Sequence, residues 1–231
     1  MENRLFAIGD IHGCFGAFEQ LIMAKIKLRK TDKLILLGDL IDRGPQSKEV
    51  VDLILDLLRN GFDIITLMGN HEDMMLNALD NEKDLPLWLY NNGYATLGSF
   101  GIKTLKDLDE RYVLFFRQLR LYYSYRDFLF VHAGFNDLIR DPFTDKVHML
   151  WTCNRIHQHP LLKDKTIIHG HKPITVEQCQ LLVRNRNQTI DIDTGCVYSN
   201  REGYGRLTAL ELYSFQMYSV HNGSFNQTSK L

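Results

Sequence analysis

The stretch KLILLGDLIDRGP, from Lys33 to Pro45, decides how the rest of this chain is interpreted. It opens with a short apolar run that ends at Gly38, a pattern typical of a buried parallel strand. A helical pattern follows, so the polar residues in between should form the loop at the carboxyl end of the strand. Open α/β sheets place their ligand sites at that edge. The loop carries two carboxylates and a guanidinium, Asp39, Asp42 and Arg43.

Length and composition indicate one globular domain. The chain has 231 residues, 45% of them hydrophobic, and contains no Pro/Gly/Ser-rich linker or internal repeat. We therefore predict a single domain over residues 1–221 and a polar C-terminal tail over 222–231. Lys plus Arg number 27 and Asp plus Glu 28, a formal net charge of −1, which gives no electrostatic reason to expect nucleic acid as a partner.

Targeting signals and cysteines bear on the compartment. No apolar run near the N-terminus has the length of a signal peptide, and no stretch approaches the ~20 apolar residues that a membrane span needs. The cysteines show no CxxC spacing, so we expect reduced thiols. The sequence thus predicts a cytoplasmic protein that does not act at a membrane.

Short apolar runs, each closed by a glycine or a polar residue, recur along the chain and are predicted to be strands. They are Leu5–Ile8, Lys33–Leu37, Asp63–Met68, Tyr122–Tyr125, Phe128–Val131, Thr166–Ile168, Thr189–Ile192, and a final hairpin of Leu207–Leu212 and Phe215–Val220. Helical patterns separate the first three strands, which indicates β-α-β-α-β order and parallel pairing.

The segment from about residue 80 to 121 has a different pattern. Its pattern predicts mostly helix. It contains no predicted strand followed by a glycine and an acidic residue, as occurs elsewhere in the chain. Breaks are expected at Pro86, Gly93, Gly98 and Gly101. We interpret it as a helical cap inserted into the domain.

The loops that follow the predicted strands carry metal-binding residue types. The candidates are Asp10, His12, Asp39, Asn70, His71, His132, His169 and His171. Because the carboxyl ends of parallel strands share one edge of a sheet, we expect these side chains to converge. Two aspartates, one asparagine and three histidines suit two divalent ions such as Mn, Fe or Zn, whereas Ca and Mg sites use oxygen ligands almost throughout. Asp39, on the middle loop, is the candidate to bridge the two ions.

Charge indicates the substrate class. Two divalent ions carry four positive charges, of which Asp10 and Asp39 would neutralise two. The remaining charge suits a phosphate dianion and a hydroxide activated by the metals. Arg43 offers a planar fork for phosphate oxygens. His71 should point away from the ions and protonate the leaving alkoxide, with Asp42 holding its imidazole in the required tautomer.

Not every histidine of the chain is expected to bind a metal. His169 and His171 alternate along an extended segment, so only one of them should face the metals. Four others lie in no strand-end loop and are interpreted as ordinary structural residues: His148, His157, His159 and His221.

The strand-end motifs also occur together, in this order, in a known family. They are Gly9-Asp10-Ile11-His12-Gly13, Gly38-Asp39-Leu40-Ile41-Asp42-Arg43-Gly44, Gly69-Asn70-His71-Glu72, His132-Ala133-Gly134 and Gly170-His171. This set resembles the calcineurin-like metallophosphoesterases, and most closely the phosphoprotein phosphatase branch in its small bacterial and phage form. The resemblance runs from about residue 4 to 212.

The resemblance implies a fold and a set of roles. The fold would be α/β (α+β), a β-sandwich flanked by helices in four αββα layers. The implied metal ligands are Asp10, His12 and Asp39 for one ion, and Asp39, Asn70, His132 and His171 for the other. Of the candidate metals manganese is favoured, with iron and zinc as alternatives. Phosphate binding falls to Arg43 and Asn70, and acid catalysis to His71 with Asp42.

One position departs from the family pattern. The phage-type enzymes carry a second phosphate-binding arginine two residues after a tryptophan. Here Trp151 is followed at that place by Cys153, and the next arginine is Arg155. We expect Arg155 to reach the phosphate through a shifted backbone, or else the site has one arginine fewer. Cys153 is expected to be a packing residue.

Together these features predict a binuclear metal-dependent phosphatase that acts by direct attack of hydroxide on a phosphorylated protein or a small phosphoester. Protein phosphoserine or phosphothreonine is the first substrate hypothesis. The alternative is a diadenosine tetraphosphate hydrolase with an adenosine pocket in the helical cap. Aromatic residues that would line that pocket are Tyr90, Tyr94, Phe100, Tyr112, Phe115 and Phe116. A non-catalytic binding protein is a third hypothesis, and the near-zero net charge disfavours a nuclease.

Overall fold

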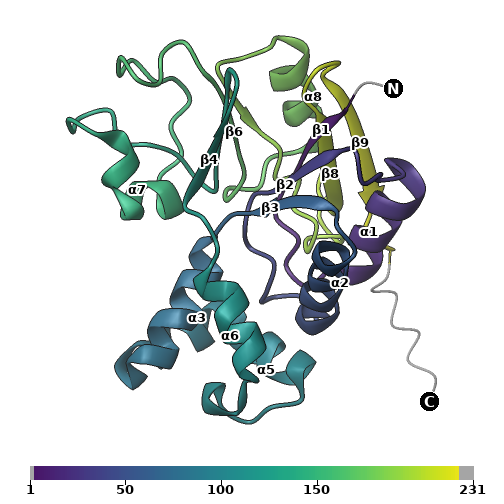
Figure 1. Ribbon diagram of the computed structural model, residues 1–231, viewed down its shortest axis with the longest axis vertical. Helices are drawn as coiled ribbons and strands as arrows, with labels where there is room; N and C mark the ends of the chain where they lie inside the picture. The colour runs from purple at the N-terminus through teal and green to yellow at the C-terminus, as the bar shows by residue number, and fades with distance from the viewer. Residues whose placement is uncertain (1–2, 224–231) are drawn as a thin grey trace.

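The computed structural model describes residues 3–223, which form two β-sheets packed together with helices around them (Figure 1). The five-stranded sheet has the order β3-β2-β1-β8-β9 and the four-stranded sheet the order β4-β5-β6-β7. The strands are β1 (Leu5–Ile8), β2 (Lys33–Leu36), β3 (Asp63–Thr66), β4 (Tyr122–Tyr125), β5 (Phe128–Val131), β6 (Thr166–His169), β7 (Thr189–Asp191), β8 (Arg206–Glu211) and β9 (Gln216–His221).

Side-chain alternation along the strands explains why two sheets form. Successive residues of a strand point to opposite faces, and β1 and β2 are apolar on both. One face packs between the sheets, with Leu5, Ala7, Ile35, Phe130, Ile168, Ile190 and Leu210 in a single buried cluster. The other packs against helices, with Phe6, Ile8, Leu34, Leu36, Phe18, Val50 and Ile54 in another. The sandwich flanked by helices is thus confirmed.

Parallel pairing sets the direction of the strand ends. Strands β1, β2 and β3 pair in parallel through α1 (Phe15–Glu19) with its continuation η1 (Gln20–Lys25), and through α2 (Ser47–Arg59). Strands β5, β6 and β7 also pair in parallel. Strand β8 pairs antiparallel with β1 and forms the expected hairpin with β9. The parallel strands therefore belong to two sheets rather than one open sheet, and both sheets supply strand-end loops.

The segment after β3 is helical, as predicted, and lies below the sheets in Figure 1. It contains α3 (Asn70–Asp80), η2 (Glu82–Asp84), α4 (Leu85–Trp88), η3 (Leu89–Gly93), α5 (Tyr94–Phe100), η4 (Leu105–Asp107) and α6 (Glu110–Arg117). Two of the expected breaks are wrong. Pro86 lies in the first turn of α4, where its missing N–H costs nothing. Gly98 lies within α5, which continues to Phe100. Gly101, with φ of +66°, is the residue that caps its end.

Other helices were not expected from the sequence. They are η5 (Pro142–Thr144), α7 (Lys146–Trp151) and α8 (Val176–Arg184). α7 is only six residues long, which leaves little periodicity to detect. α8 begins with a readable signal, a capping box in which Thr175 accepts from the backbone N–H of Gln178.

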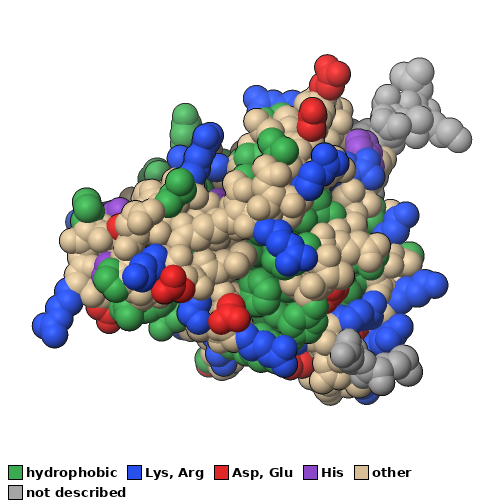
Figure 2. Space-filling model, turned by 90° about the horizontal axis from the view of Figure 1, so that it is seen from above, with side chains coloured by type: hydrophobic (Ala, Val, Ile, Leu, Met, Phe, Trp, Pro, Cys, Tyr) green, Lys and Arg blue, Asp and Glu red, His purple; other side chains and the backbone are tan. Residues whose placement is uncertain are grey.

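The end of the molecule opposite the loop residues is apolar and basic. The turn between β4 and β5 lies at the top of Figure 1, and Figure 2 views the molecule from that side. Hydrophobic side chains gather there in a patch with Lys and Arg side chains around it. In the β4–β5 turn, the Arg126 guanidinium lies over the rings of Tyr125 and Tyr213, at 5.5 and 5.3 Å.

The C-terminal boundary differs from the expected one. Asn222, assigned to the polar tail, is buried, and its side chain donates to Cys14 Sγ and to Cys196 O, each at 3.2 Å. Residues 224–231 of the expected tail lie outside the described residues. Within residues 3–223, no helix has the length and apolar character needed to cross a membrane.

Candidate active site

Loops from both sheets meet near the start of α3 and carry the residues singled out from the sequence (Figure 1). Asp10 and His12 follow β1, Asp39 follows β2, Asn70 and His71 open α3, His132 follows β5, and His171 follows β6. All are buried except His171, which is partly exposed. The structure brings these side chains together around Asp39.

Several of these loops have an unusual backbone. φ is positive at His12 (+46°), Asp39 (+47°), Asp42 (+67°), Arg43 (+65°) and His171 (+76°). Residues with a side chain rarely adopt this left-handed conformation, and where they do they cluster at functional sites. Gly44 permits a close contact between two of these loops, because a Cβ there would lie 2.1 Å from the His12 carbonyl oxygen.

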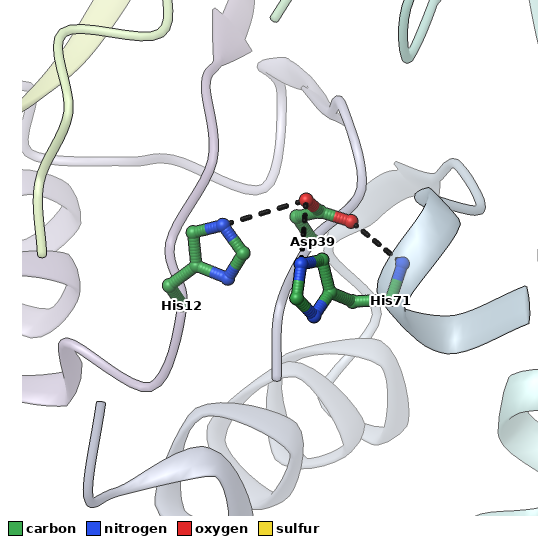
Figure 3. A group of neighbouring side chains, drawn as sticks. All are labelled: His12, Asp39 and His71. Atoms are coloured by element: carbon green, nitrogen blue, oxygen red, sulfur yellow. Dashed lines mark hydrogen bonds and ion pairs between the residues drawn. The ribbon is translucent and has the colours of Figure 1, made fainter. Parts of the chain in front are cut away.

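Asp39 lies between two groups of nitrogen atoms. Its Oδ2 is 3.4 Å from His12 Nε2 and 4.0 Å from His71 Nε2 (Figure 3). Its Oδ1 is 3.5 Å from His132 Nε2 and accepts a 3.1 Å hydrogen bond from the backbone N–H of His71. Candidate ligand atoms of Asp39, His132 and His171 lie within 4.8 Å of one another, as do those of His12, Asp39 and His71. Asp39 therefore belongs to both groups, as a bridging carboxylate would.

Hydrogen bonds fix which ring nitrogen of His12 and His132 carries the lone pair. His12 Nδ1 donates to Ile41 O at 2.9 Å, and His132 Nδ1 donates to Leu37 O at 3.0 Å. Burial lowers the pKa of both imidazoles, which are therefore neutral near pH 7. The Nε2 atom of each ring is left as an acceptor, the form that binds a metal.

Three of these candidate ligands crowd together. His132 Nε2 lies 2.9 Å from Asn70 Oδ1 and 3.2 Å from His171 Nδ1, and Asn70 Oδ1 lies 3.0 Å from His171 Nδ1. Burial lowers the pKa of His171 to about 3, so this ring is neutral too. His132 Nε2 and Asn70 Oδ1 are both acceptors, and a cation between them would relieve their repulsion. This nitrogen and oxygen set fits a borderline divalent ion.

Two buried carboxyl groups also indicate a cation site, because a bound cation would stabilise their ionised forms. Asp10 and Asp193 are buried, and Asp10 accepts from the His171 backbone N–H with both carboxylate oxygens at 3.2 Å. Burial raises the pKa of Asp10 well above its usual range, helped by the charges of Asp193 and Asp39. Burial raises the pKa of Asp193 to about 7. The strand-end motifs assign Asp193 no role, although its position after the predicted strand Thr189–Ile192 could have indicated one.

Asp42 and His71 form a separate pair. His71 Nδ1 lies 2.7 Å from Asp42 Oδ2, and both side chains are fully buried. His71 Nε2 has no hydrogen-bond partner among residues 3–223. Burial lowers the pKa of His71, but the carboxylates of Asp39 and Asp42 outweigh this effect and raise it above its usual value. The pair can therefore hold a proton on His71 and present it from Nε2.

Glu72 organises the loop that contains Asp39. Its buried carboxylate accepts from the backbone N–H groups of Asp39 at 2.9 Å, Leu40 at 2.7 Å, Ile41 at 3.2 Å and Gly69 at 2.9 Å. The sequence pattern assigns Glu72 no role beyond its place in the motif, because three of its four partners lie 31 to 33 residues away.

The two arginines lie in different surroundings. Arg43 Nη1 donates to His12 Nε2 at 2.9 Å, so this guanidinium is already in the site. Arg155 is exposed and lines a 520 Å³ pocket together with Cys153 and Asp191. The Cys153 thiol donates to Gly170 O at 3.7 Å, and burial raises its pKa to about 12, so it is unreactive at neutral pH.

Two further histidines are buried outside these groups. His169 Nδ1 lies 3.1 Å from Gly170 O and 4.0 Å from Asp191 Oδ2. His157 Nδ1 pairs with Asp137 Oδ1 at 2.8 Å. Neither contributes an atom to the two groups of candidate ligand atoms found in residues 3–223.

A two-sheet sandwich with histidines, carboxylates and an asparagine at its strand ends defines a class of metal-dependent phosphoesterases. Residues 4–205 match the Metallophos family, described as calcineurin-like phosphoesterase, and the chain belongs to this family. Its members use divalent metal ions, which the residues described above fit.

Individual relatives differ in substrate. Serine/threonine-protein phosphatase 2 of Salmonella typhimurium is 30% identical over 185 residues, which cover 74% of this chain and 80% of the relative. The asymmetrical bis(5'-nucleosyl)-tetraphosphatase PrpE of Anoxybacillus flavithermus is 27% identical over 237 residues, covering 92% of each chain. The cold-active protein-tyrosine phosphatase of a Shewanella species has a similar fold, with a TM-score of 0.61 and 16% identity over 96% of this chain and 81% of that one.

Proposed function

We propose that this phosphoesterase is a binuclear metal-dependent phosphatase that acts on phosphoserine or phosphothreonine in proteins. The observation that carries the binuclear proposal is the position of Asp39, whose two oxygens face different groups of candidate ligands. One ion would be held by Asp10, His12 and Asp39, and the other by Asp39, Asn70, His132 and His171. Bound divalent ions of this kind lower the pKa of water to ~7 and polarise phosphoryl oxygens. Manganese is the favoured metal.

The protein's own groups would bind and protonate the substrate. Arg43 would donate to two phosphate oxygens through its planar guanidinium, and the Asn70 side-chain amide would donate to another. Because Arg155 is exposed, we assign it no more than a weak contact with the phosphate. As a hydroxide oxygen bonds to phosphorus and the ester P–O bond breaks, His71 Nε2 would give its proton to the leaving oxygen. Asp42 would hold the imidazole through its Nδ1.

The similarity to the Salmonella protein phosphatase supports the protein substrate. A specific feature favours a second candidate, hydrolysis of a dinucleoside tetraphosphate. A pocket of 420 Å³ lies in the helical segment and is lined by residues that include Leu85, Leu89, Tyr94 and Lys103. Its volume is in the range of small-molecule sites, and the PrpE relative aligns over 92% of both chains. Of the other cap aromatics, Tyr112, Phe115 and Phe116 are buried in the core.

The test is hydrolysis of p-nitrophenyl phosphate, a phosphoserine peptide and diadenosine tetraphosphate, each with Mn²⁺ and with a chelator. We expect turnover that needs the metal and a higher kcat/KM for the peptide. A higher kcat/KM for the tetraphosphate would replace the first candidate by the second. Metal-loaded protein that turns over none of the three would contradict both.

A pair of variants separates the two candidates further. Tyr94 lines the pocket, whereas Tyr90, 87% exposed, is not among its lining residues. If adenosine binds in the pocket, Tyr94→Ala should raise KM for diadenosine tetraphosphate by ~5-fold or more, the value of one lost stacking contact, and Tyr90→Ala should not. The KM for the peptide should not change in either variant.

A further inference from the structure

The Asp42 carboxylate is held by two residues of the helical segment. Its Oδ2 accepts from Trp88 Nε1 at 2.9 Å in addition to His71 Nδ1, and its Oδ1 accepts from Thr96 Oγ1 at 2.6 Å. Trp88 and Thr96 are both buried, with 0% and 1% of their surface exposed. They lie 46 and 54 residues from Asp42 in the sequence, so these bonds join separate parts of the fold.

The chemistry of the donors indicates where the protons of this network lie. Indole Nε1–H can only donate. Thr96 Oγ1 accepts from the Asp42 backbone N–H at 2.9 Å and lies 3.2 Å from Ser47 Oγ, so its one hydroxyl proton is available for the Asp42 carboxylate. With Trp88 and Thr96 donating, the carboxylate is stabilised as the anion. His71 Nδ1 must then be the donor in its own bond, which leaves Nε2 to face Asp39.

A kink brings the two donors to the same carboxylate. Trp88 ends α4 and Thr96 lies in α5, and between them Asn92 has φ of +69°. Gly93 packs against the indole face so closely that a Cβ there would lie 2.5 Å from Trp88 Cδ2 and Cε2. The orientation of Trp88 therefore depends on the absence of a side chain at position 93.

We propose that Trp88 and Thr96 are positioning residues for catalysis, which orient the Asp42–His71 pair so that His71 Nε2 can reach the leaving oxygen. This inference rests on the proposed role of His71 as the acid. It gives the helical segment a catalytic task that is separate from any part in substrate binding. A misplacement of about 1 Å in a catalytic group can cost ~10²-fold in rate.

The test compares Trp88→Phe and Thr96→Val with Thr96→Ser, which keeps the hydroxyl, at saturating Mn²⁺. For a phosphate ester with an alkyl leaving group we expect kcat to fall ~10–100-fold in the first two variants and by much less in Thr96→Ser. For p-nitrophenyl phosphate, whose leaving group needs little protonation, the losses should be several-fold smaller, with KM unchanged. Equal losses on both esters would overturn the inference.

A second set of variants moves the indole without removing a hydrogen-bonding group. Gly93→Ala should reproduce the leaving-group-dependent loss of Trp88→Phe, because the new methyl displaces the ring. Gly98→Ala is the matched control, since a Cβ there would meet nothing within 4 Å. Wild-type selectivity between the two esters in Gly93→Ala would count against the inference.

Proton NMR gives a readout that does not depend on turnover. In the full chain loaded with diamagnetic Zn²⁺, the Nδ1–H of His71 should appear as a low-field resonance that is missing in His71→Asn. It should shift or disappear in Trp88→Phe and Thr96→Val and remain in Thr96→Ser. An unchanged resonance in all these variants would overturn the inference.

The His71→Asn variant separates the two levels of the proposal. Equal losses on both esters in His71→Asn would overturn the acid role and this inference with it. A leaving-group-dependent loss in His71→Asn, but not in Trp88→Phe or Thr96→Val, would overturn the inference alone.

Discussion

Two neighbouring regions of the site differ in how well their polar atoms are satisfied. The Asp42 carboxylate receives donors from His71, Trp88 and Thr96. Elsewhere in the site, His132 Nε2 lies 2.9 Å from the acceptor Asn70 Oδ1. The Asp42 carboxylate thus receives donors from the protein itself, whereas His132 Nε2 and Asn70 Oδ1 are two acceptors in contact. A buried polar group without a partner is costly, so this contrast distinguishes the residues proposed to orient a proton from those proposed to bind a cation.

The largest loss of activity should come from replacing the shared acceptor Asp39 of the proposed metal ligands by a residue that donates hydrogen bonds. Asp39→Asn places an N–H₂ group among the lone pairs of His12 and His132 and removes the shared negative charge. We expect no measurable turnover of p-nitrophenyl phosphate and loss of bound metal, measured by elemental analysis. The control Asp63→Asn changes an exposed carboxylate at the start of β3. Normal turnover with full metal content in Asp39→Asn would rule out the bridging role.

Disrupting the Asp42–His71 pair should leave the bound metal in place. His71→Asn removes the proton donor, and kcat for an alkyl phosphate ester should fall by ~10²–10⁴-fold, the usual contribution of a general acid. The metal content should equal that of the wild type. A loss of metal along with activity would indicate that His71 is a metal ligand rather than the acid.

A smaller effect is expected at the arginine that lies in the site. Arg43→Lys keeps the charge but removes the planar fork, so KM for p-nitrophenyl phosphate should rise ~10-fold, about the value of one charge-assisted hydrogen bond. Arg155→Lys is the comparison, and because Arg155 is exposed we expect a change in KM of less than ~2-fold. Equal increases in the two variants would instead support the phosphate contact predicted for Arg155.

The smallest effect should be one of stability. Glu72→Gln replaces one of two oxygens that together accept four backbone N–H groups with an N–H₂ donor. We expect the free energy of unfolding, measured with urea, to fall by ~1–3 kcal/mol. Glu49→Gln, on the exposed side of α2, should change it by less than ~0.5 kcal/mol. If the two variants were equally stable, the Glu72 hydrogen bonds would contribute little.

The strand-end residues could be found from the sequence because each follows a local signal, an apolar run closed by a glycine or a polar residue. Residues that act through distant contacts could not. Trp88 and Thr96 look like ordinary helix residues, and only the folded chain brings them to Asp42. The apolar periodicity also predicted the strands without showing that they divide into two sheets, since a strand buried on both faces looks the same in either arrangement. Strand β3 is also shorter than the predicted Asp63–Met68: Leu67 N–H still bonds to Leu36 O of β2, and Met68 N–H bonds to Arg120 O instead.

The pairing of β1 with β8 has a consequence for synthesis of the chain. Leu5 N–H reaches Glu211 Oε1 across 206 residues, and β8 covers the flank of β1 that β2 leaves open. At ~5–20 residues per second, the ribosome delivers β8 roughly 10–40 s after β1. During that interval one edge of the strand that leads to Asp10 has no partner from its own sheet. The nascent chain would therefore complete the surroundings of the loop that carries Asp10 only after β8 has been synthesised.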